Sequence, residues 1–210
     1  MQSELDFVPL TEKFISQVVD IHSQAFKGQM NVNLGKIYLY GFFNWYVDYR
    51  DSISFVAIEN GEHIRGYVIG APLGYEIRMN RDLFWVTAGS LISRPALWFK
   101  RNIRDTVIVR AKMLLGFQQS KIDYPQLPLP VVSLVGIGVD PQYQKGGIGF
   151  QLMRIFEKKS EEMHMKSMRL SVYPDNLRAR RLYEKCGWSA FSNFEQPKRA
   201  MYYYKEIING

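Results

Sequence analysis

One stretch of the sequence, VGIGVDPQYQKGGIGFQLM (Val135–Met153), constrains the fold more than any other. The apolar run Val131–Val139 predicts a buried strand, and the Asp-Pro pair after it turns the chain. The next segment, Lys145–Met163, has helical spacing. Glycines between them leave backbone N–H groups uncovered where the predicted helix begins, at the positive end of its dipole. This order indicates an α/β fold with an anion-binding site at a helix N-terminus.

Two common phosphate-binding patterns do not explain this loop. The P-loop pattern G-x-x-x-x-G-K-[ST] is absent from the sequence. The dinucleotide fingerprint G-x-G-x-x-G also fails, because Gly136-Ile-Gly138 is followed by Val-Asp-Pro. What remains is Gln144-x-x-Gly147-x-Gly149, placed after the strand and its turn.

The rest of the chain predicts a mixed α/β domain, a sheet with helices packed on its faces. Thr11 is a candidate N-cap for the first helix, and an Asn-Gly pair joins two strands as a hairpin. The predicted strands are 7–10, 53–58, 64–70, 131–139, 167–172, 188–194 and 200–207. The predicted helices are 14–25, 34–49, 145–163 and 176–186.

Residues 71–128 interrupt this rhythm and are predicted to be a helical, basic insert. A helix is expected from Pro95 to about Leu115, since proline suits a first helical turn. The segment holds nine Lys and Arg against four Asp and Glu, which gives +5 of the chain's +7. It is either a solvated helical face or a lid over a substrate or a membrane surface.

Composition fits one soluble globular domain over residues 1–210. Of the 210 residues, 47% are hydrophobic and 22% charged. A single cysteine, Cys186, excludes an intrachain disulfide and a thiolate metal site, and the three histidines lack metal-like spacing. No secretory signal and no run of roughly 18 apolar residues is present. We therefore expect a cytoplasmic protein, and its positive charge favours an anionic ligand.

The glycine loop resembles the acetyl-CoA loop of the GCN5-related N-acetyltransferases (GNAT), V-x-P-x-x-[QR]-x-x-G-x-[GA]. The matching residues are Val139, Pro141, Gln144, Gly147 and Gly149. Downstream, YPDNLRARRLYEKCGW resembles the family's second signature, N-x-x-A-x-x-L-Y-x-K-x-G-[FW]. That signature is matched at Asn176, Ala179, Leu182, Tyr183, Lys185, Gly187 and Trp188. The resemblance covers about Val131–Phe194 and leaves the insert out.

The resemblance implies a mixed, mostly antiparallel sheet that is splayed at its centre and flanked by helices, with the helical insert between the third and fourth strands. It also implies acetyl-CoA as co-substrate, with no metal. Loop amides would bind the pyrophosphate, and the splayed strand would pair with the pantetheine arm. Gly136 and Gly138 suit a bulge or close approach of the ligand. The cofactor-binding residues implied are Ile137, Gly138, Val139, Gln144, Lys145, Gly146, Gly147, Ile148, Gly149, Phe150, Asn176 and Tyr183.

For catalysis, the resemblance implies direct attack of an amine on the thioester, with Tyr183 as the general acid. The general base is the gap. Many relatives carry Glu or Asp on the strand equivalent to Val131–Val139, and here that strand has none. Glu76 is a candidate base; Asp48, His63 or a water molecule held by backbone carbonyls are alternatives.

The acceptor is expected to be a small primary amine, such as an amino sugar or a sugar nucleotide, because of the aromatic segment Tyr38–Tyr49 and the basic insert. A protein or peptide N-acetyltransferase and a catalytically silent CoA-binding module are the alternatives. No recognition motif supports nucleic-acid binding. Peripheral membrane contact through the insert stays open, as does the oligomeric state, including a homodimer.

Overall fold

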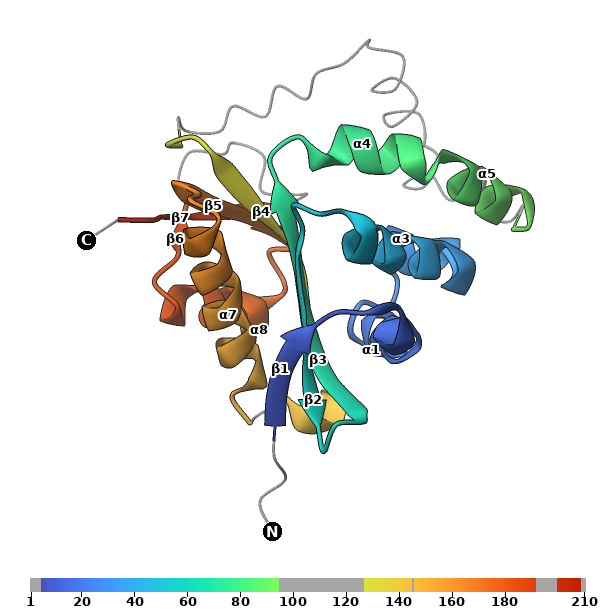
Figure 1. Ribbon diagram of the computed structural model, residues 1–210, viewed down its shortest axis with the longest axis horizontal. Coiled ribbons are helices and arrows are strands. Elements are labelled where there is room, and N and C mark those ends of the chain that lie inside the picture. The colour runs from blue at the N-terminus through green and yellow to red at the C-terminus, as the bar shows by residue number, and fades with distance from the viewer. Residues whose placement is uncertain (1–4, 95–126, 145, 192–199, 209–210) are drawn as a thin grey trace.

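The computed structural model describes residues 5–94, 127–144, 146–191 and 200–208. Within these residues, seven strands form one sheet in the order β1-β2-β3-β4-β5-β7-β6 (Figure 1). Among these seven strands, only β4 and β5 pair in parallel. The strands are β1 (Leu5–Pro9), β2 (Ile53–Glu59), β3 (His63–Pro72), β4 (Val131–Val139), β5 (Ser167–Val172), β6 (Ser189–Ala190) and β7 (Met201–Glu206). This is the mixed, mostly antiparallel sheet that the sequence predicts.

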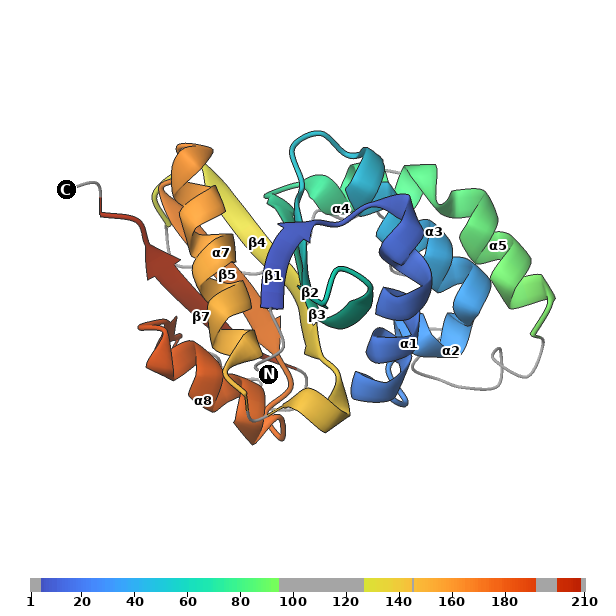
Figure 2. The ribbon, with the colours of Figure 1, turned by 60° about the horizontal axis from the view of Figure 1, so that its bottom comes forward.

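Helices cover both faces of the sheet. Figure 2 shows α7 and α8 on one side, and α1 with the helices that follow it on the other. The first group is α7 (Ile148–Glu162) and α8 (Leu177–Lys185). The second group is α1 (Ile15–Ala25), α2 (Met30–Leu34), α3 (Lys36–Asp48), α4 (Tyr75–Asp82) and α5 (Phe84–Ile92), and two short 3-10 turns are η1 (Glu12–Phe14) and η3 (Pro141–Tyr143).

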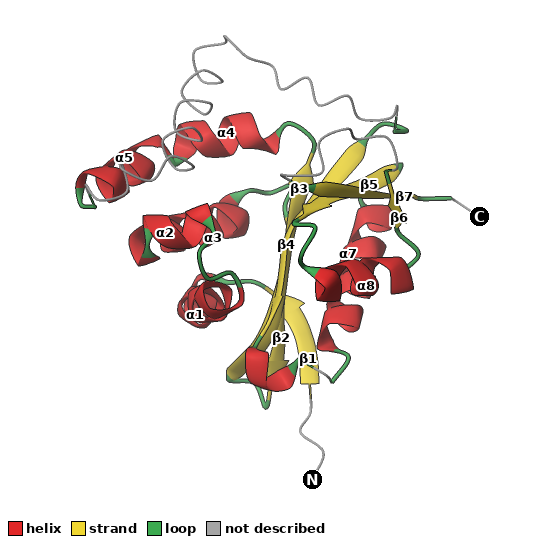
Figure 3. Ribbon diagram, turned by 180° about the vertical axis from the view of Figure 1, so that it is seen from behind, coloured by secondary structure: helices red, strands yellow, loops and turns green. Residues whose placement is uncertain are grey.

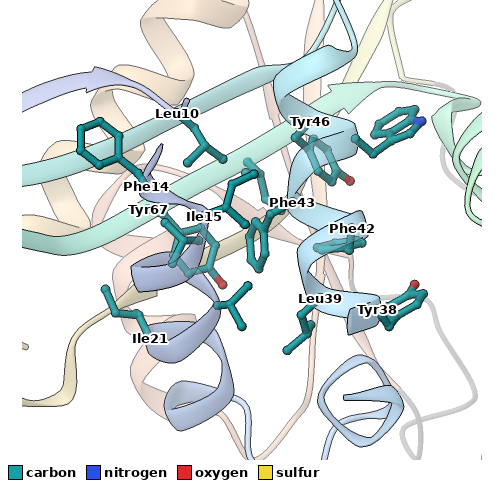
Figure 4. Packing of buried hydrophobic residues seen from close by; sticks show 14 of the residues in the cluster. Leu10, Phe14, Ile15, Ile21, Tyr38, Leu39, Phe42, Phe43, Tyr46 and Tyr67 are labelled. Carbon is teal, nitrogen blue, oxygen red and sulfur yellow. The ribbon is translucent and has the colours of Figure 1, made fainter. Parts of the chain in front are cut away.

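Each face of the sheet has its own hydrophobic core. The first core joins α1 and α3 to β2 and β3 and is rich in aromatic rings, among them Phe43 and Tyr67, whose centroids lie 5.2 Å apart (Figure 4). The second core packs Leu152 and Phe156 of α7 against β2, β3, β4 and β5. Because the central strands are buried on both faces, their sequences read as nearly continuous apolar runs.

Three predicted helix boundaries were wrong. Thr11 precedes only η1 and makes no side-chain capping bond, and α1 begins at Ile15. Gly35, with φ 92° and ψ 177°, ends the unpredicted helix α2, so the predicted second helix begins at Lys36, in α3, instead of at Leu34. Gly147 has φ 78°, which is outside the helical region, so α7 begins at Ile148 instead of Lys145.

The insert is helical where the structure describes it, in α4 and α5, which follow β3 directly. The helix predicted from Pro95 to about Leu115 lies outside the described residues. So do the last three residues of the strand predicted over 188–194, of which β6 forms two residues. Among the residues described, no helix has the length and apolar character needed to span a membrane.

Candidate active site

A slot opens in the sheet where β4 separates from β5. The two strands pair only from Val131↔Ser167 to Leu134↔Leu170, whereas β4 stays paired with β3 as far as Val139. A bulge at Val135 shifts the β3–β4 register between Ile69 and Gly70, at the point of separation. Figure 3 shows β4 following β3 while β5 and β7 diverge from it. The predicted splay at the centre of the sheet is therefore confirmed.

Three neighbouring cavities follow this slot. The slot cavity, of about 290 Å³, shares Ile137, Asn176 and Ala179 with a larger cavity of about 500 Å³ at the glycine loop. At its other end it shares Leu134 and Val135 with a cavity of about 110 Å³ beside α4. We name these the loop cavity, the slot cavity and the closed-end cavity; together they form one track along β4.

The loop cavity is suited to an anion. Gly147 lies in the left-handed region, and the N–H groups of Gly147, Ile148, Gly149 and Phe150 find no acceptor within the described part of the chain. These amides lie at the N-terminus of a 15-residue helix, where the dipole favours negative charge. The opposite wall carries the cationic side chains of Arg178, Arg181 and Lys185 from α8. Lys145 lies outside the described residues.

Arg65 holds the turn that leads into this loop. Arg65 lies at the β-bulge of β3, between Ile64 and Gly66. Its backbone carbonyl accepts a hydrogen bond from the Asp140 N–H at 2.9 Å. Its guanidinium group lies 3.9 Å from the centre of the Tyr143 ring. The Asp140 carboxylate accepts from the Gln142 N–H at 3.0 Å. These contacts fix the path of the chain from β4 to α7.

Gln144 also has a structural task. Its Nε2 donates to the Val139 carbonyl at 3.1 Å, its Oε1 accepts from Arg178, and its own carbonyl accepts from Arg178 Nη2 at 2.8 Å. The side chain thus joins the loop to α8. This supplies a reason for glutamine here that does not depend on contact with a ligand.

Packing against Tyr67 requires a glycine at position 138, independently of any approach by a ligand. A Cβ at Gly138 would lie 2.5 Å from a ring carbon of Tyr67, its cross-strand partner. A Cβ at Gly136 would lie 3.7 Å from the same ring, which is an ordinary contact.

The Tyr67 hydroxyl lies 2.6 Å from Nδ1 of the buried His22, whose Nε2 has no partner within the residues described.

Tyr183 lines the slot cavity from α8. It is buried against Trp188 and Tyr203, at ring-centroid distances of 6.3 and 5.8 Å. Burial raises the pKa of its phenol well above the ordinary value, so the hydroxyl stays protonated. Within the described part of the chain this hydroxyl makes no hydrogen bond, which leaves its proton available to a ligand in the slot.

Asn176 both caps α8 and lines the track. Its Oδ1 accepts from the Ala179 N–H at 3.1 Å, as expected of an N-cap residue. It borders the slot and loop cavities and an open cavity of about 450 Å³ next to Phe26. The two roles considered for Asn176, helix cap and cofactor contact, are compatible in this geometry.

The closed-end cavity contains the candidate base. Glu76 lies in the first turn of α4, and its Oε1 is 3.2 Å from Nη2 of Arg169 on β5. Arg169 Nε donates to Ser133 Oγ at 2.8 Å. Tyr75, Ser171 and Tyr202 also line this cavity. Asp48 and His63, the alternative bases, line none of the three cavities of the track.

Known proteins match this chain in both sequence pattern and fold. The model of the acetyltransferase (GNAT) family matches residues 16–188. The chain belongs to the GNAT family. No curated protein matches the sequence. The assignment of this chain to the GNAT family therefore rests on the family model, and solved structures show the fold.

Solved structures share the whole GNAT fold with this chain at low sequence identity. Ard1 from Thermoplasma volcanium has a TM-score of 0.60 at 14% identity, with 98% of this chain and 99% of that chain covered. The ribosomal-protein-S18-alanine N-acetyltransferase of Escherichia coli has 0.57 at 15%, covering 99% and 97%. Arabidopsis thaliana NAA60 in complex with acetyl-CoA has 0.59 at 16%, covering 97% and 99%.

Membership of the GNAT family makes acetyl transfer the activity of this chain. The structure brings together most residues that the resemblance implied, on the loop, on β4 and on α8, along one track. Among the described residues, no group of three or more His, Cys, Asp or Glu side chains could hold a metal ion.

Sequence reasoning missed Arg169, Arg65 and the pair His22–Tyr67. Arg169 had a usable signal, since it is the one charged residue in the otherwise apolar and hydroxylated strand SMRLSV. The other contacts join α1 to β3 and β3 to the turn after β4. They depend on sheet register, which residue spacing along one segment does not reveal.

Proposed function

We propose that this chain is an acetyl-CoA-dependent N-acetyltransferase that acts directly on the primary amine of a small molecule. One observation carries the proposal: a continuous track runs from an anion-binding loop, through a slot beside Tyr183, to a small cavity with a carboxylate at its wall. In the reaction a C–N bond forms and the C–S bond breaks. The acceptor nitrogen gives up a proton to the protein or solvent, and the departing sulfur takes one up.

The cofactor end of the track fits a CoA thioester, which would supply the activated acetyl group. Amides of Gly147–Phe150 would hold the pyrophosphate, with Arg178 and Arg181 adding positive charge. The backbone of Ile137–Val139, without a β5 partner, would hydrogen-bond the pantetheine arm. Its N–H groups are also suited to polarising a carbonyl oxygen in the slot.

Tyr183 would donate a hydrogen bond and a proton to the departing sulfur. Its buried phenol stays protonated near neutral pH, because burial raises its pKa. A phenol at its reference pKa of roughly 10 is a weaker acid than a thiol at roughly 8.5. The hydrogen bond to developing negative charge on sulfur is therefore the larger part of its contribution.

Glu76 would receive the proton that the acceptor nitrogen loses. Its carboxylate lines the closed-end cavity, and its side chain is 38% exposed, so the proton can pass on to solvent. The neutral amine then has its lone pair free for attack. In this proposal the base comes from α4, in the insert, instead of from β4.

The size of the closed-end cavity supports a small acceptor. At about 110 Å³ it holds only the aminated end of a molecule, well below the roughly 300–1,000 Å³ of drug-sized sites. Tyr75 and Glu76 of α4, with Tyr202 of β7, form its walls. Amino sugars and sugar nucleotides are the first amines to test, with their larger part outside this cavity.

The test is release of free thiol from acetyl-CoA with a panel of amino sugars, sugar nucleotides, simple alkylamines and peptides, with the acetylated product identified by mass spectrometry. Turnover of small amines is expected. Activity restricted to peptide N-termini would overturn the small-molecule acceptor, and no turnover together with tight CoA binding would indicate a silent binding module.

Replacement of Tyr183 by phenylalanine separates catalysis from binding. The Tyr183→Phe variant should keep CoA affinity, measured by calorimetry, because the ring and its packing remain. Its kcat should fall by about 10²-fold, the usual effect of losing one hydrogen-bond donor to charge that develops in the transition state. An unchanged kcat would remove Tyr183 from the mechanism.

A further inference from the structure

The helices α4 and α5 lie beyond α3, at the outer edge of the helical layer (Figure 1). Their outer side carries Ile77, Trp85 and Ile92, which are 67%, 80% and 79% exposed, together with the half-exposed Phe84. The first three recur every seven or eight residues, or two helical turns, and helical hydrogen bonding continues through Leu83 between the two helices. These four side chains therefore form one stripe, which we name the apolar face.

The opposite side of the same helices is packed. Leu83 and Val86 face α3, where a Cβ added at Gly41 would lie 3.5 and 3.4 Å from their side chains. On the outer side, a Cβ added at Gly89 would meet no atom of the described residues within 4 Å. Single exposed apolar side chains are common on protein surfaces, whereas a contiguous exposed patch marks a binding surface. The apolar face is such a patch, and within the described part of the chain no element packs on it.

The apolar face has a cationic rim. The side chains of Arg78 and Arg81 are 60% and 73% exposed, and Arg94 is exposed just after α5. The acidic residues of α4 neutralise this rim only in part, because Asp82 carries one charge beside two arginines, at 3.8 and 3.5 Å, and Glu76 lines the closed-end cavity. The next residues of the sequence, 95–126, hold six Lys and Arg against two Asp and Glu, which adds to the positive charge of this part of the chain.

This charge decides between the partners that an apolar helix face can have. A second copy of the chain, docked about a two-fold axis, would bring the cationic rim against itself. A bilayer with anionic lipids instead offers negative headgroups to the arginines and an apolar boundary to the other side chains. Trp suits that boundary because its ring is apolar and its N–H is polar. Arg suits it because its stem is apolar and its charged end reaches the headgroups.

We propose that the apolar face docks on a bilayer surface that contains anionic lipids, with α4 and α5 lying in the plane of the interface. Trp85 and Ile92 enter the boundary between headgroups and acyl chains, while Arg78 and Arg81 contact lipid phosphates. Because α4 also carries Glu76, docking brings the closed-end cavity beside the headgroups. This role goes beyond the proposed function and does not depend on it.

The first experiment measures co-sedimentation of the full chain with vesicles of phosphatidylcholine alone and of phosphatidylcholine mixed with phosphatidylserine. We expect binding to the mixed vesicles, with an affinity that falls as salt screens the arginines. Binding to phosphatidylcholine alone should be much weaker, because only the apolar contribution remains. No binding of the wild-type chain to either kind of vesicle would overturn the proposal.

Substitutions that keep the charge test the apolar face itself, because the net charge of +7 alone draws the chain toward anionic vesicles. Trp85→Ser and Ile92→Ser should each weaken binding to mixed vesicles about tenfold, since each removes a large apolar side chain from the boundary. Ile208→Ser is the matched control, because Ile208 is 90% exposed after β7, outside the apolar face. Equal binding by wild type and the two variants of the apolar face would overturn the proposal.

A second pair of variants locates the charge that binds. Arg81→Gln removes one arginine from the rim and should weaken binding about fivefold, the effect of one basic residue at an anionic surface. Lys158→Gln removes an exposed lysine from α7, on the other face of the sheet, and should leave the affinity as it is. An equal loss in the two variants would indicate binding by net charge and would contradict docking through this face.

Two further measurements separate this proposal from its rivals. CoA affinity, measured by calorimetry, should be the same in all variants, which shows that each is folded. Light scattering gives the oligomeric state: a wild-type dimer that Trp85→Ser converts to a monomer, without vesicle binding, would assign the apolar face to a second copy instead. Vesicle binding without turnover of any amine would uphold this proposal and remove only the proposed function.

Discussion

At the scale of single residues, the buried pair of His22 and Tyr67 makes stability depend on pH. Burial lowers the pKa of His22 from 6.5 to about 4. Between these values the unfolded chain binds a proton that the native chain does not, so the free energy of unfolding falls as pH drops from 6.5 toward 4. The loss amounts to about 3 kcal/mol at most, since one pKa unit corresponds to about 1.4 kcal/mol. Urea denaturation across this range measures it.

Two variants isolate the contribution of His22. His22→Gln cannot titrate, and its stability should change less between pH 6.5 and 4 than that of wild type. His63→Gln removes an exposed histidine and should leave the wild-type slope as it is. If His22→Gln and wild type lose equal stability on acidification, the pH dependence has another source.

Glycines of one motif differ in what they tolerate. Gly138→Ala would place a methyl group 2.5 Å from the Tyr67 ring, and overpacking of this kind costs about 1–3 kcal/mol. Gly146→Ala is the matched control, because its nearest neighbour, the Tyr143 carbonyl, would be 3.6 Å away. Thermal and urea unfolding of both variants tests the difference. Equal stability of the two would refute the packing requirement.

The sequence could predict the role of a residue when that role depends on its neighbours in the chain. The cap at Asn176 depends on neighbours in the chain, and the sequence offered it correctly as a helix cap. The ion pair between Arg169 and Glu76 joins residues 93 positions apart. Its formation depends on where α4 meets β5, which no segment encodes alone.

At the scale of elements, α8 shows how one side chain serves both a helix and a site. Asn176→Ala removes the cap bond to the Ala179 N–H and should cost about 0.5–2 kcal/mol of stability. Asn176→Asp keeps a capping oxygen and should restore that stability. Only the amide can donate to a ligand, so CoA affinity should stay reduced in both variants. Recovery of affinity in Asn176→Asp would show that the cap alone matters.

Elements themselves were predictable where their periodicity is strong, and less so where glycine or the insert intervenes. Strands β2 to β5 and helix α7 lie close to where alternation and helical spacing placed them. Helix α3 matches the predicted second helix to within two residues at each end, whereas α2, on the other side of Gly35, was not predicted. Helices α4 and α5 are short and were covered only by the general expectation of a helical insert.

At the scale of the whole molecule, the sheet ties the two hydrophobic cores into one folding unit. Val56 and Tyr67 face the first core, and their strand neighbours Ala57 and Val68 face the second. A substitution that destabilises either core therefore also destabilises the strands that both cores share. We expect a single cooperative unfolding transition, in keeping with one domain over residues 1–210.

Truncation of one large ring in each core tests this expectation. Phe43→Ala and Phe156→Ala remove fully buried rings and should each cost about 3–5 kcal/mol. Phe84→Ala, at a half-exposed ring on α5, should cost far less. Trp45 belongs to the first core and Trp188 to the second, so single-tryptophan variants report on each core separately. Both probes should shift together with each truncation, because the strands between the cores are shared. Separate midpoints, with only the nearer probe shifted, would show two independent units and place the slot at a boundary between them.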